Sequence, residues 1–156
     1  MAPPERFGDR ELTFLGALVD EGVDFMLVGL SAAALQGAPV VTQAVDLWFA
    51  DLTRRSGLDR ALRKVGGTYL PPDGNRPPMI VGEGVSVFDI VVHMDGLEGF
   101  SQERQGAVLI DLRDVGVPVL PMDRIIASMG ATGREKDRLV LPVLRDALAA
   151  ISGRTR

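Results

Sequence analysis

The stretch that decides the fold is residues 25–49, with the sequence FMLVGLSAAALQGAPVVTQAVDLWF. Its first four residues are apolar and predict a short buried strand, and residues 45–49 predict a second strand. Between them we expect a tight turn at Gly29-Leu30-Ser31 and a short alanine-rich helix over residues 32–36. Gly37 follows that helix and is typical of a helix end. The stretch therefore predicts a strand–helix–strand unit.

The rest of the chain predicts more helices and strands in alternation. We expect a helix that is N-capped by Asp9 and ends near Gly22, and a long strand over residues 85–93 with Asp89 near its middle. Pro142 lies inside the last predicted helix and must kink it or begin a new one. The other predicted elements are a polar helix at about 53–65, a loop at 71–78, a turn at 82–84 between two strands, a hairpin of strands 108–112 and 117–120 around residues 114–116, and helices at 123–129 and 134 to about 151. This order predicts an α/β or α+β fold with a small mixed sheet flanked by helices.

The composition fits one globular domain and excludes several kinds of site. The chain has 156 residues, 46% of them hydrophobic, which is enough for an ordinary core. We expect a single domain over residues 1–156, with a core at about 10–120 and C-terminal helices at about 121–151. The absence of cysteine excludes disulfides, a thiolate nucleophile and sulfur-ligated zinc, and a single histidine, His93, excludes a His-rich metal site.

Charge and hydropathy narrow the class of partner. The chain has 17 Lys and Arg against 21 Asp and Glu, a formal net charge of −4, so we expect no strong attraction to nucleic acid. No apolar run reaches the roughly 18 residues that cross a bilayer, and the first residues lack the apolar segment of a secretion signal. We therefore expect a cytoplasmic protein with no membrane partner. A basic strip is interpreted as the solvated face of the predicted polar helix; its members are Arg54, Arg55, Arg60, Arg63 and Lys64.

Two carboxylates lie inside apolar predicted strands. Asp46 is flanked by Val45 and Leu47, and Asp89 by Phe88 and Ile90. Because side chains alternate along a strand, each acid points to one face while its neighbours point to the other. If the strands are adjacent, both carboxylates can converge on a cation, since unpaired buried charges are costly. The other interpretation places each acid on the solvent face of the sheet or beside an arginine.

These acids belong to a combination of motifs along most of the chain. A strand leads into the Gly29–Ser31 turn and a short helix, a second strand carries Asp46, and a third carries Asp89. The downstream segments are DRIIASM at residues 123–129 and GREKD at residues 133–137. Together they resemble the nucleotidyltransferase superfamily, and most closely its small bacterial branch, the minimal or toxin–antitoxin-type nucleotidyltransferases. In that family a Gly-Ser turn, an Asp-x-Asp strand, a third Asp and a Lys-Asp pair occur in this order.

The resemblance implies roles for several residues. In nucleotidyl transfer, Mg²⁺ ions held by acidic side chains neutralise the charge on the reacting phosphate oxygens. Asp46 and Asp89 would be the catalytic and metal-binding carboxylates, with Mg²⁺ as the cofactor and a nucleoside triphosphate (NTP) as ligand or substrate. Glycine in the turn allows backbone amides to approach phosphates, and a serine hydroxyl can bond to them. The nucleotide-binding residues implied are Gly29, Leu30, Ser31, Lys136 and Asp137.

The sequence also departs from the family pattern. The first acid of Asp-x-Asp is Ala44, the preceding arginine is Gln43, and the lysine expected in the 123–129 helix is Met129. The family's glycine pair is reduced to Gly29 followed by leucine. One deliberate substitution would explain Ala44 alone, so the three changes favour a degenerate natural site. Loss of an outer partner of a metal site typically costs 10–100-fold in affinity or activity, and loss of a direct ligand should cost more.

Three functions remain open at this point. The preferred hypothesis is a pseudoenzyme that binds a nucleotide, a protein partner or a second copy of itself. The alternative is an active Mg²⁺-dependent enzyme that moves NMP from NTP to a protein, RNA or small-molecule acceptor. The third is a partner-binding module without nucleotide affinity. The resemblance implies a toxin–antitoxin or phage-defence setting. His93 is interpreted as a surface histidine, and Arg134, Lys136 and Asp137 either form a helix-start charge cluster or line the cleft.

Overall fold

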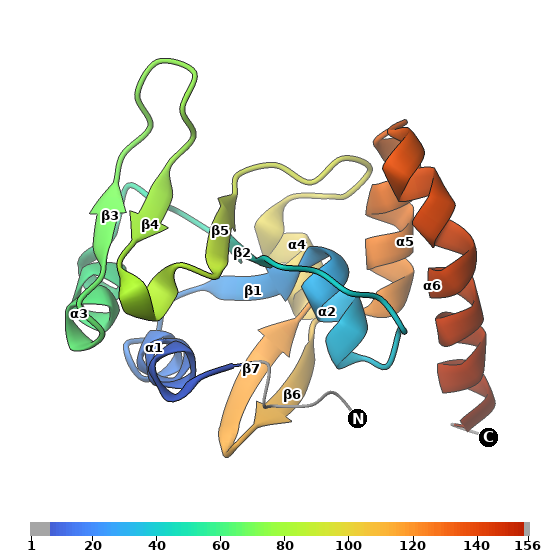
Figure 1. The fold of residues 1–156 in the computed structure, drawn as a ribbon, viewed down its shortest axis with the longest axis horizontal. Helices are drawn as coiled ribbons and strands as arrows, with labels where there is room; N and C mark the ends of the chain where they lie inside the picture. The colour runs from blue at the N-terminus through green and yellow to red at the C-terminus, as the bar shows by residue number, and fades with distance from the viewer. Residues whose placement is uncertain (1–6, 155–156) are drawn as a thin grey trace.

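The computed structural model describes residues 7–154 and shows a mixed sheet with helices around it (Figure 1). Within these residues no helix combines the length and apolar character needed to cross a membrane. The helices and strands in chain order are α1 (Asp9–Asp20), β1 (Phe25–Val28), α2 (Gly29–Leu35), β2 (Val45–Phe49), α3 (Ser56–Lys64), β3 (Thr68–Leu70), β4 (Met79–Val81), the 3₁₀ turn η2 (Glu83–Val85), β5 (Phe88–Val91), α4 (Phe100–Gln105), β6 (Val108–Leu112), β7 (Val115–Val119), α5 (Met122–Ala131) and α6 (Glu135–Arg154).

The main sheet has five strands in the order β5-β2-β1-β7-β6. β1 is antiparallel to β2 and parallel to β7, β5 is parallel to β2, and β6 is antiparallel to β7. β3 and β4 form a separate antiparallel hairpin, whose loop extends away from the rest of the chain (green in Figure 1). The predicted fold class, a small mixed sheet flanked by helices with a helical C-terminal end, is therefore confirmed.

The hydrophobic core surrounds β1. All four of its residues are buried, which explains their continuous apolar run, since a central strand is covered on both faces. On one side α1 packs against α3 and β7, and its Phe14 ring lies 5.4 Å from the Phe88 ring of β5. On the other side α2 packs against β1, β2 and α5, and α5 packs against α6. Helices on both faces thus leave the strand ends as the place where polar groups can gather.

Several predicted boundaries around the strands were wrong. No separate turn precedes the short helix, because α2 begins at Gly29 itself, whose φ of +73° reverses the chain in one residue. The strand expected over residues 85–93 is only β5, because η2 ends at Val85, a turn occupies residues 86–87, and the strand ends at Val91. The turn of the β6–β7 hairpin is Arg113–Asp114 rather than residues 114–116, and both have positive φ, as in a two-residue type I′ hairpin.

The helices show similar differences at their ends. Asp9 lies in the first turn of α1 and does not cap it, since the N-cap is Gly8 without a side-chain hydrogen bond. Pro142 lies within the continuous α6, so it does not begin a new helix. The polar helix is shorter than expected, from Ser56 to Lys64. Helix α4 and strand β3 were not predicted, because each is six residues or fewer and carries no clear periodicity.

One buried ion pair joins α4 to α5. The Nε and Nη2 of Arg124 donate to the two carboxylate oxygens of Glu103 at 2.9 and 2.7 Å, and the backbone N–H of Glu98 donates to the same carboxylate at 2.9 Å. The Glu103 side chain is only 5% exposed. The hydrogen bonds from Arg124 hold the pKa of Glu103 below its ordinary value of 4.5. The pair therefore fixes the segment after β5 relative to α5, and both elements form walls of the cleft described below.

Replacing Arg124 by methionine should lower stability, because it keeps much of the side chain's bulk but leaves the buried Glu103 carboxylate without its cation. We expect the free energy of unfolding at pH 7 to fall by about 1–3 kcal/mol in urea titration. The deficit should shrink in acid, because the pair's contribution is complete above pH 4.5 and is lost as pH falls through the lowered pKa of Glu103. Arg138→Met changes an exposed arginine of α6 and should have little effect. Equal stability of the two variants would contradict the role of the pair.

Candidate functional site

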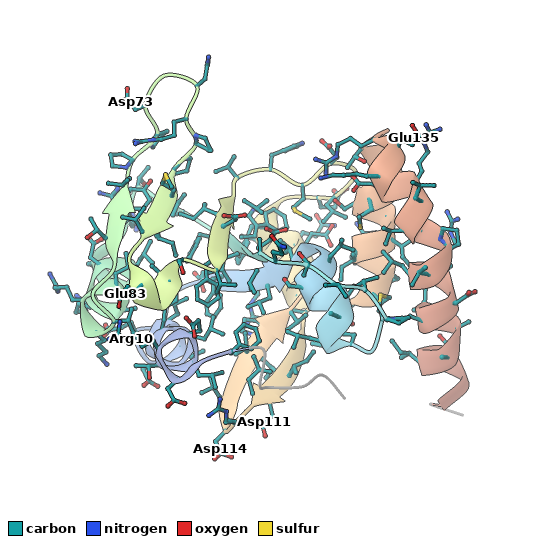
Figure 2. The ribbon with its side chains drawn as sticks, in the orientation of Figure 1. Arg10, Asp73, Glu83, Asp111, Asp114 and Glu135 are labelled. Carbon is teal, nitrogen blue, oxygen red and sulfur yellow. The ribbon has the colours of Figure 1, made fainter. Side chains whose placement is uncertain are left out.

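A cleft of about 600 Å³ opens where the ends of the central strands face α5 and α6. It is lined from the sheet side by residues of β1, α2, β2 and β5, and from the helix side by the last turns of α5 and the start of α6. In Figure 2 the first residue of α6, Glu135, lies at the upper end of that helix, across from the sheet. About half of the lining is apolar, and the rest carries both acidic and basic side chains. Most of the predicted site residues meet here.

Asp46 and Asp89 lie side by side at the floor of this cleft. They are register partners on the adjacent parallel strands β2 and β5, so their side chains point to the same face of the sheet. Asp46 is half-buried and Asp89 is exposed. Burial, and then the nearby Asp89 carboxylate, raise the pKa of Asp46 to about 6, while Lys136 acts in the opposite direction. The two strands are therefore adjacent and the two carboxylates are neighbours, as the sequence analysis considered. Their roles in metal binding and catalysis stay predictions.

Gly29 makes room for the Asp46 carboxylate. Val28 pairs with Asp46 across β1 and β2, so Gly29 follows directly at the strand end. A Cβ on Gly29 would lie 2.5 Å from Asp46 Oδ2, and the φ of +73° is one that residues with side chains rarely adopt. Only glycine therefore allows the chain to turn here with the carboxylate against its backbone.

The other two residues of the predicted phosphate turn are placed differently. Leu30 lines the cleft, as expected for this position. Ser31 is 4% exposed, is not part of the cleft lining, and its hydroxyl donates to the backbone carbonyl of Val28 at 3.3 Å. Because α2 begins at Gly29, Ser31 lies inside the first helical turn, and its side chain is directed toward the core. In this conformation its hydroxyl is not available to a ligand in the cleft.

Basic groups face the acids from the start of α6. Lys136 is exposed and lines the cleft, and its charge acts on Asp46. Asp137 also lines the cleft, but it is 4% exposed, and its Oδ2 accepts hydrogen bonds from Thr132 Oγ1 at 2.7 Å and from Arg134 Nε at 2.8 Å. The sequence left two interpretations open for Arg134, Lys136 and Asp137, and both hold. Arg134 and Asp137 form an ion pair at the start of α6, and all three residues line the cleft.

Two residues after β5 and one serine of α5 also line the cleft. His93 and Asp95 follow β5 and form an exposed pair with Nε2 and Oδ1 3.1 Å apart, so His93 is a surface histidine at the cleft rim. Ser128 of α5 is 4% exposed, and its hydroxyl forms no hydrogen bond with any part of the chain that the structure describes. A lone serine in a helix has no sequence signal, so only the packing of α5 on the sheet reveals it.

The acid pair fits one Mg²⁺ ion better than two. Mg²⁺ is usually held by one or two carboxylates, with water and phosphate oxygens filling its octahedral shell. Asp46 and Asp89 supply two such carboxylates, whereas between residues 7 and 154 no group of three or more His, Cys, Asp or Glu side chains is placed to hold a metal. Ala44 precedes β2 and offers no ligand; its carbonyl accepts a hydrogen bond from Thr42 at 3.2 Å. Asp51 lies beyond the end of β2, where it binds Thr53.

Solved structures of nucleotidyltransferases resemble the fold of this chain. A candidate nucleotidyltransferase from Thermotoga maritima shares 18% identity, covers 91% of this chain and 93% of its own, and has a TM-score of 0.64. The antibiotic-resistance factor ANT(2'')-Ia shares 14% identity over 94% of this chain and 95% of its own, with a TM-score of 0.52. The same protein in complex with adenylyl-2''-tobramycin gives 13% identity, 93% and 96% coverage and a TM-score of 0.52. No protein-family model matches the sequence, and a search of curated proteins found no match. The chain has the nucleotidyltransferase fold.

Replacing Gly29 by alanine should destabilise the protein and displace Asp46. The backbone strain at positive φ costs about 1–2 kcal/mol, and the contact with Asp46 Oδ2 adds to it. Gly22 is a matched control, because its φ is +68° but a Cβ there meets nothing within 4 Å. Urea unfolding should therefore show a larger loss for Gly29→Ala than for Gly22→Ala. Equal losses would mean that Asp46 does not constrain this position.

Replacing Asp46 by asparagine should stabilise the metal-free protein at neutral pH. The folded-state pKa of about 6 lies above the ordinary 3.8, so the native state binds the proton more tightly, and stability falls as pH rises from about 4 to 6. Allowing for partial solvent screening, we expect a gain on the order of 1 kcal/mol at pH 7.5, or about 2–4 °C in Tm. The gain should vanish at pH 4. Asp111→Asn, at an exposed position of β6, should show no such pH-dependent gain.

Proposed function

We propose that this protein is a pseudoenzyme that binds a nucleoside triphosphate with Mg²⁺ in the cleft and transfers nucleotidyl groups poorly. The observation that carries the proposal is the pairing of Asp46 with Asp89 on one side of the cleft, opposite the basic residues at the start of α6. Acidic groups suit a metal ion, and basic groups suit the phosphates that the ion bridges. The same cleft lacks the acid that Ala44 replaces.

The charge distribution supports binding of a metal–phosphate ligand. Burial, and then the neighbouring Asp89 carboxylate, raise the pKa of Asp46, and a divalent cation at the two carboxylates would stabilise the charged form of Asp46. Arg134 and Lys136 would face the phosphates on the other side of the cation. The apolar part of the lining, which includes Met94 and Met129, offers a surface for the nucleoside.

The donor set supports weak turnover. Two-metal nucleotidyl transfer needs carboxylates that hold one ion at the attacking oxygen and another at the leaving group. Asp46 and Asp89 can hold one ion, and Ala44 removes the ligand that would join a second to it. Mg²⁺, when bound, would supply neutralisation of phosphate charge, and the chain's own contribution is to orient the triphosphate. Binding without efficient transfer is therefore the function that these residues support best.

One observation favours the active alternative. Asp46 and Asp89 are still paired on adjacent strands, so the one ion that they can hold could still activate a triphosphate for attack by a hydroxyl group. On that reading the protein would move NMP to an acceptor. The neighbour ANT(2'')-Ia was solved with a nucleotidylated aminoglycoside, adenylyl-2''-tobramycin, which makes small molecules the first acceptors to try. A protein partner in a toxin–antitoxin setting is a further proposal that the resemblance suggests.

Calorimetric titration with ATP, GTP, CTP and UTP, with and without Mg²⁺, tests the proposal. We expect Mg²⁺-dependent binding of at least one nucleotide by the wild type. Asp46→Asn and Asp89→Asn should each weaken it about 10–100-fold, because each removes a metal ligand. Asp111→Asn is the matched control: Asp111 lies on β6, at the lower end of the view in Figure 2, and should leave binding unchanged. The absence of binding to any of the four nucleotides would leave a partner-binding module and reject the proposal.

An acid introduced at position 44 should strengthen metal binding. Ala44→Asp adds a carboxylate two residues before Asp46, at the entry of β2. We expect Mg²⁺-dependent NTP affinity to rise about tenfold or more, and pyrophosphate release from NTP to become measurable above the wild-type level. Ala44→Asn, which is similar in size but uncharged, serves as the control. Pyrophosphate release by the wild type at the Ala44→Asp rate would show that Ala44 does not limit the chemistry, and the pseudoenzyme proposal would fail.

A further inference from the structure

The start of α6 contains a side-chain cluster whose geometry separates two roles. Asp137 Oδ2 accepts from Arg134 Nε at 2.8 Å and from Thr132 Oγ1 at 2.7 Å. The backbone N–H of Arg134 donates to the same threonine hydroxyl oxygen at 3.2 Å. All three residues line the cleft that contains Asp46 and Asp89. The guanidinium is thus held at its Nε by a carboxylate that is itself fixed by a hydroxyl.

Burial differs sharply between the two charged partners. The Asp137 side chain is 5% exposed, whereas that of Arg134 is 62% exposed. The carboxylate therefore lies inside the wall and the guanidinium outside it. The two terminal nitrogens of Arg134, Nη1 and Nη2, form no hydrogen bond or ion pair within residues 7–154. Their four N–H groups are the fork that binds a phosphate or carboxylate through two parallel bonds.

Arg134 lies at the start of α6 among charges of both signs. Glu135 and Asp137 are acidic residues of the first turn, and Lys136 lies between them. Asp137 is bonded to the Nε edge of the Arg134 guanidinium, so the opposite edge is open toward the cleft lining. A phosphate group in the cleft would accept hydrogen bonds from that open edge. Asp137 cannot supply that contact to a nucleotide, because a buried carboxylate repels phosphate.

We propose that Arg134 is a phosphate-binding residue of the cleft, and that Asp137 and Thr132 position its guanidinium without contacting the ligand. This inference rests on the proposed nucleotide binding and assigns the triphosphate contact within it. It also changes the role of Asp137, which the sequence resemblance implied to be a nucleotide contact, to that of a positioning residue. Lys136 remains the second basic residue of the cleft, and its positive charge acts on Asp46.

The test measures binding of AMP, ADP and ATP, each with Mg²⁺, by calorimetry or by displacement of a fluorescent nucleotide. For the wild type we expect affinity to rise with the number of phosphates. Arg134→Gln should remove most of that rise, with a loss of about 10–100-fold for ATP and little change for AMP. Arg138→Gln, a variant of an exposed arginine that does not line the cleft, is the matched control.

A double-mutant cycle separates positioning from contact. Asp137→Asn should weaken ATP binding by about 3–10-fold when Arg134 is present and should have no further effect in the Arg134→Gln background. A residue that contacts the nucleotide, or one that merely supports the fold, would lower affinity in both backgrounds. Thr132→Val should behave like Asp137→Asn, and Thr132→Ser, which keeps the hydroxyl, should restore binding. These threonine variants keep the test decisive if Asp137→Asn does not fold.

The outcomes distinguish this inference from the proposed function. Wild-type protein that binds none of ATP, GTP, CTP and UTP overturns both; where another triphosphate binds in place of ATP, the test uses the mono-, di- and triphosphates of that nucleoside. Wild-type binding that Arg134→Gln leaves unchanged overturns only the role of Arg134. An Asp137→Asn effect that persists without Arg134 overturns only the positioning role of Asp137. The inference is supported if Arg134→Gln weakens the binding of ATP but not of AMP, and if Asp137→Asn has no further effect once Arg134 is replaced.

Discussion

The register of β1 between its two neighbours is the constraint on which the site depends. β1 is buried on both faces, so its position in the sheet is fixed by hydrophobic burial. Its last residue, Val28, pairs with Asp46, and Asp46 pairs on its other side with Asp89. A slip of one residue on β2 would turn the Asp46 side chain to the opposite face of the sheet, away from the backbone of Gly29 and from Asp89. One set of backbone pairings thus brings the turn and both acids together.

The arrangement places the acids on rigid strands and the bases on a helix start. Asp46 and Asp89 cannot move apart without breaking the β2–β5 ladder, so the second carboxylate adds to the effect of burial in raising the pKa of Asp46. Arg134 and Lys136 come from a segment joined to the sheet through α5. The Glu103–Arg124 pair ties α5 to the segment after β5, so the two walls of the cleft are connected away from the opening. Both walls are therefore positioned before any ligand arrives.

Much of this fold could be predicted from local sequence, and much of the site could not. Apolar patterning predicts the strands at residues 25–28 and 45–49, because burial and alternation depend on near neighbours. The same patterning makes Asp46 stand out as an acid inside an apolar strand. Ser31 illustrates the limit: its motif implies a phosphate contact, but the helix that begins at Gly29 turns its hydroxyl to Val28. Asp137 and Ser128 depend on how α5 and α6 pack, a long-range property that spacing along the chain does not encode.

The energetics of the cleft favour a ligand over an empty partner-binding surface. A protein with no use for a cation would gain stability by replacing Asp46, whose half-buried charge stands beside a second carboxylate. On the other wall, Arg134 bonds to Asp137 through its Nε, so the outer edge of its guanidinium is open to an anion. Functional sites keep an unfavourable group such as the Asp46 carboxylate because the ligand compensates for it. One ligand suits both walls at once, since a divalent cation bound to phosphates presents positive charge to the strands and negative charge to α6. In the proposed function, alanine at position 44 in place of an acid limits what the cleft does with that ligand, while Asp46, Asp89 and Arg134 remain to bind it.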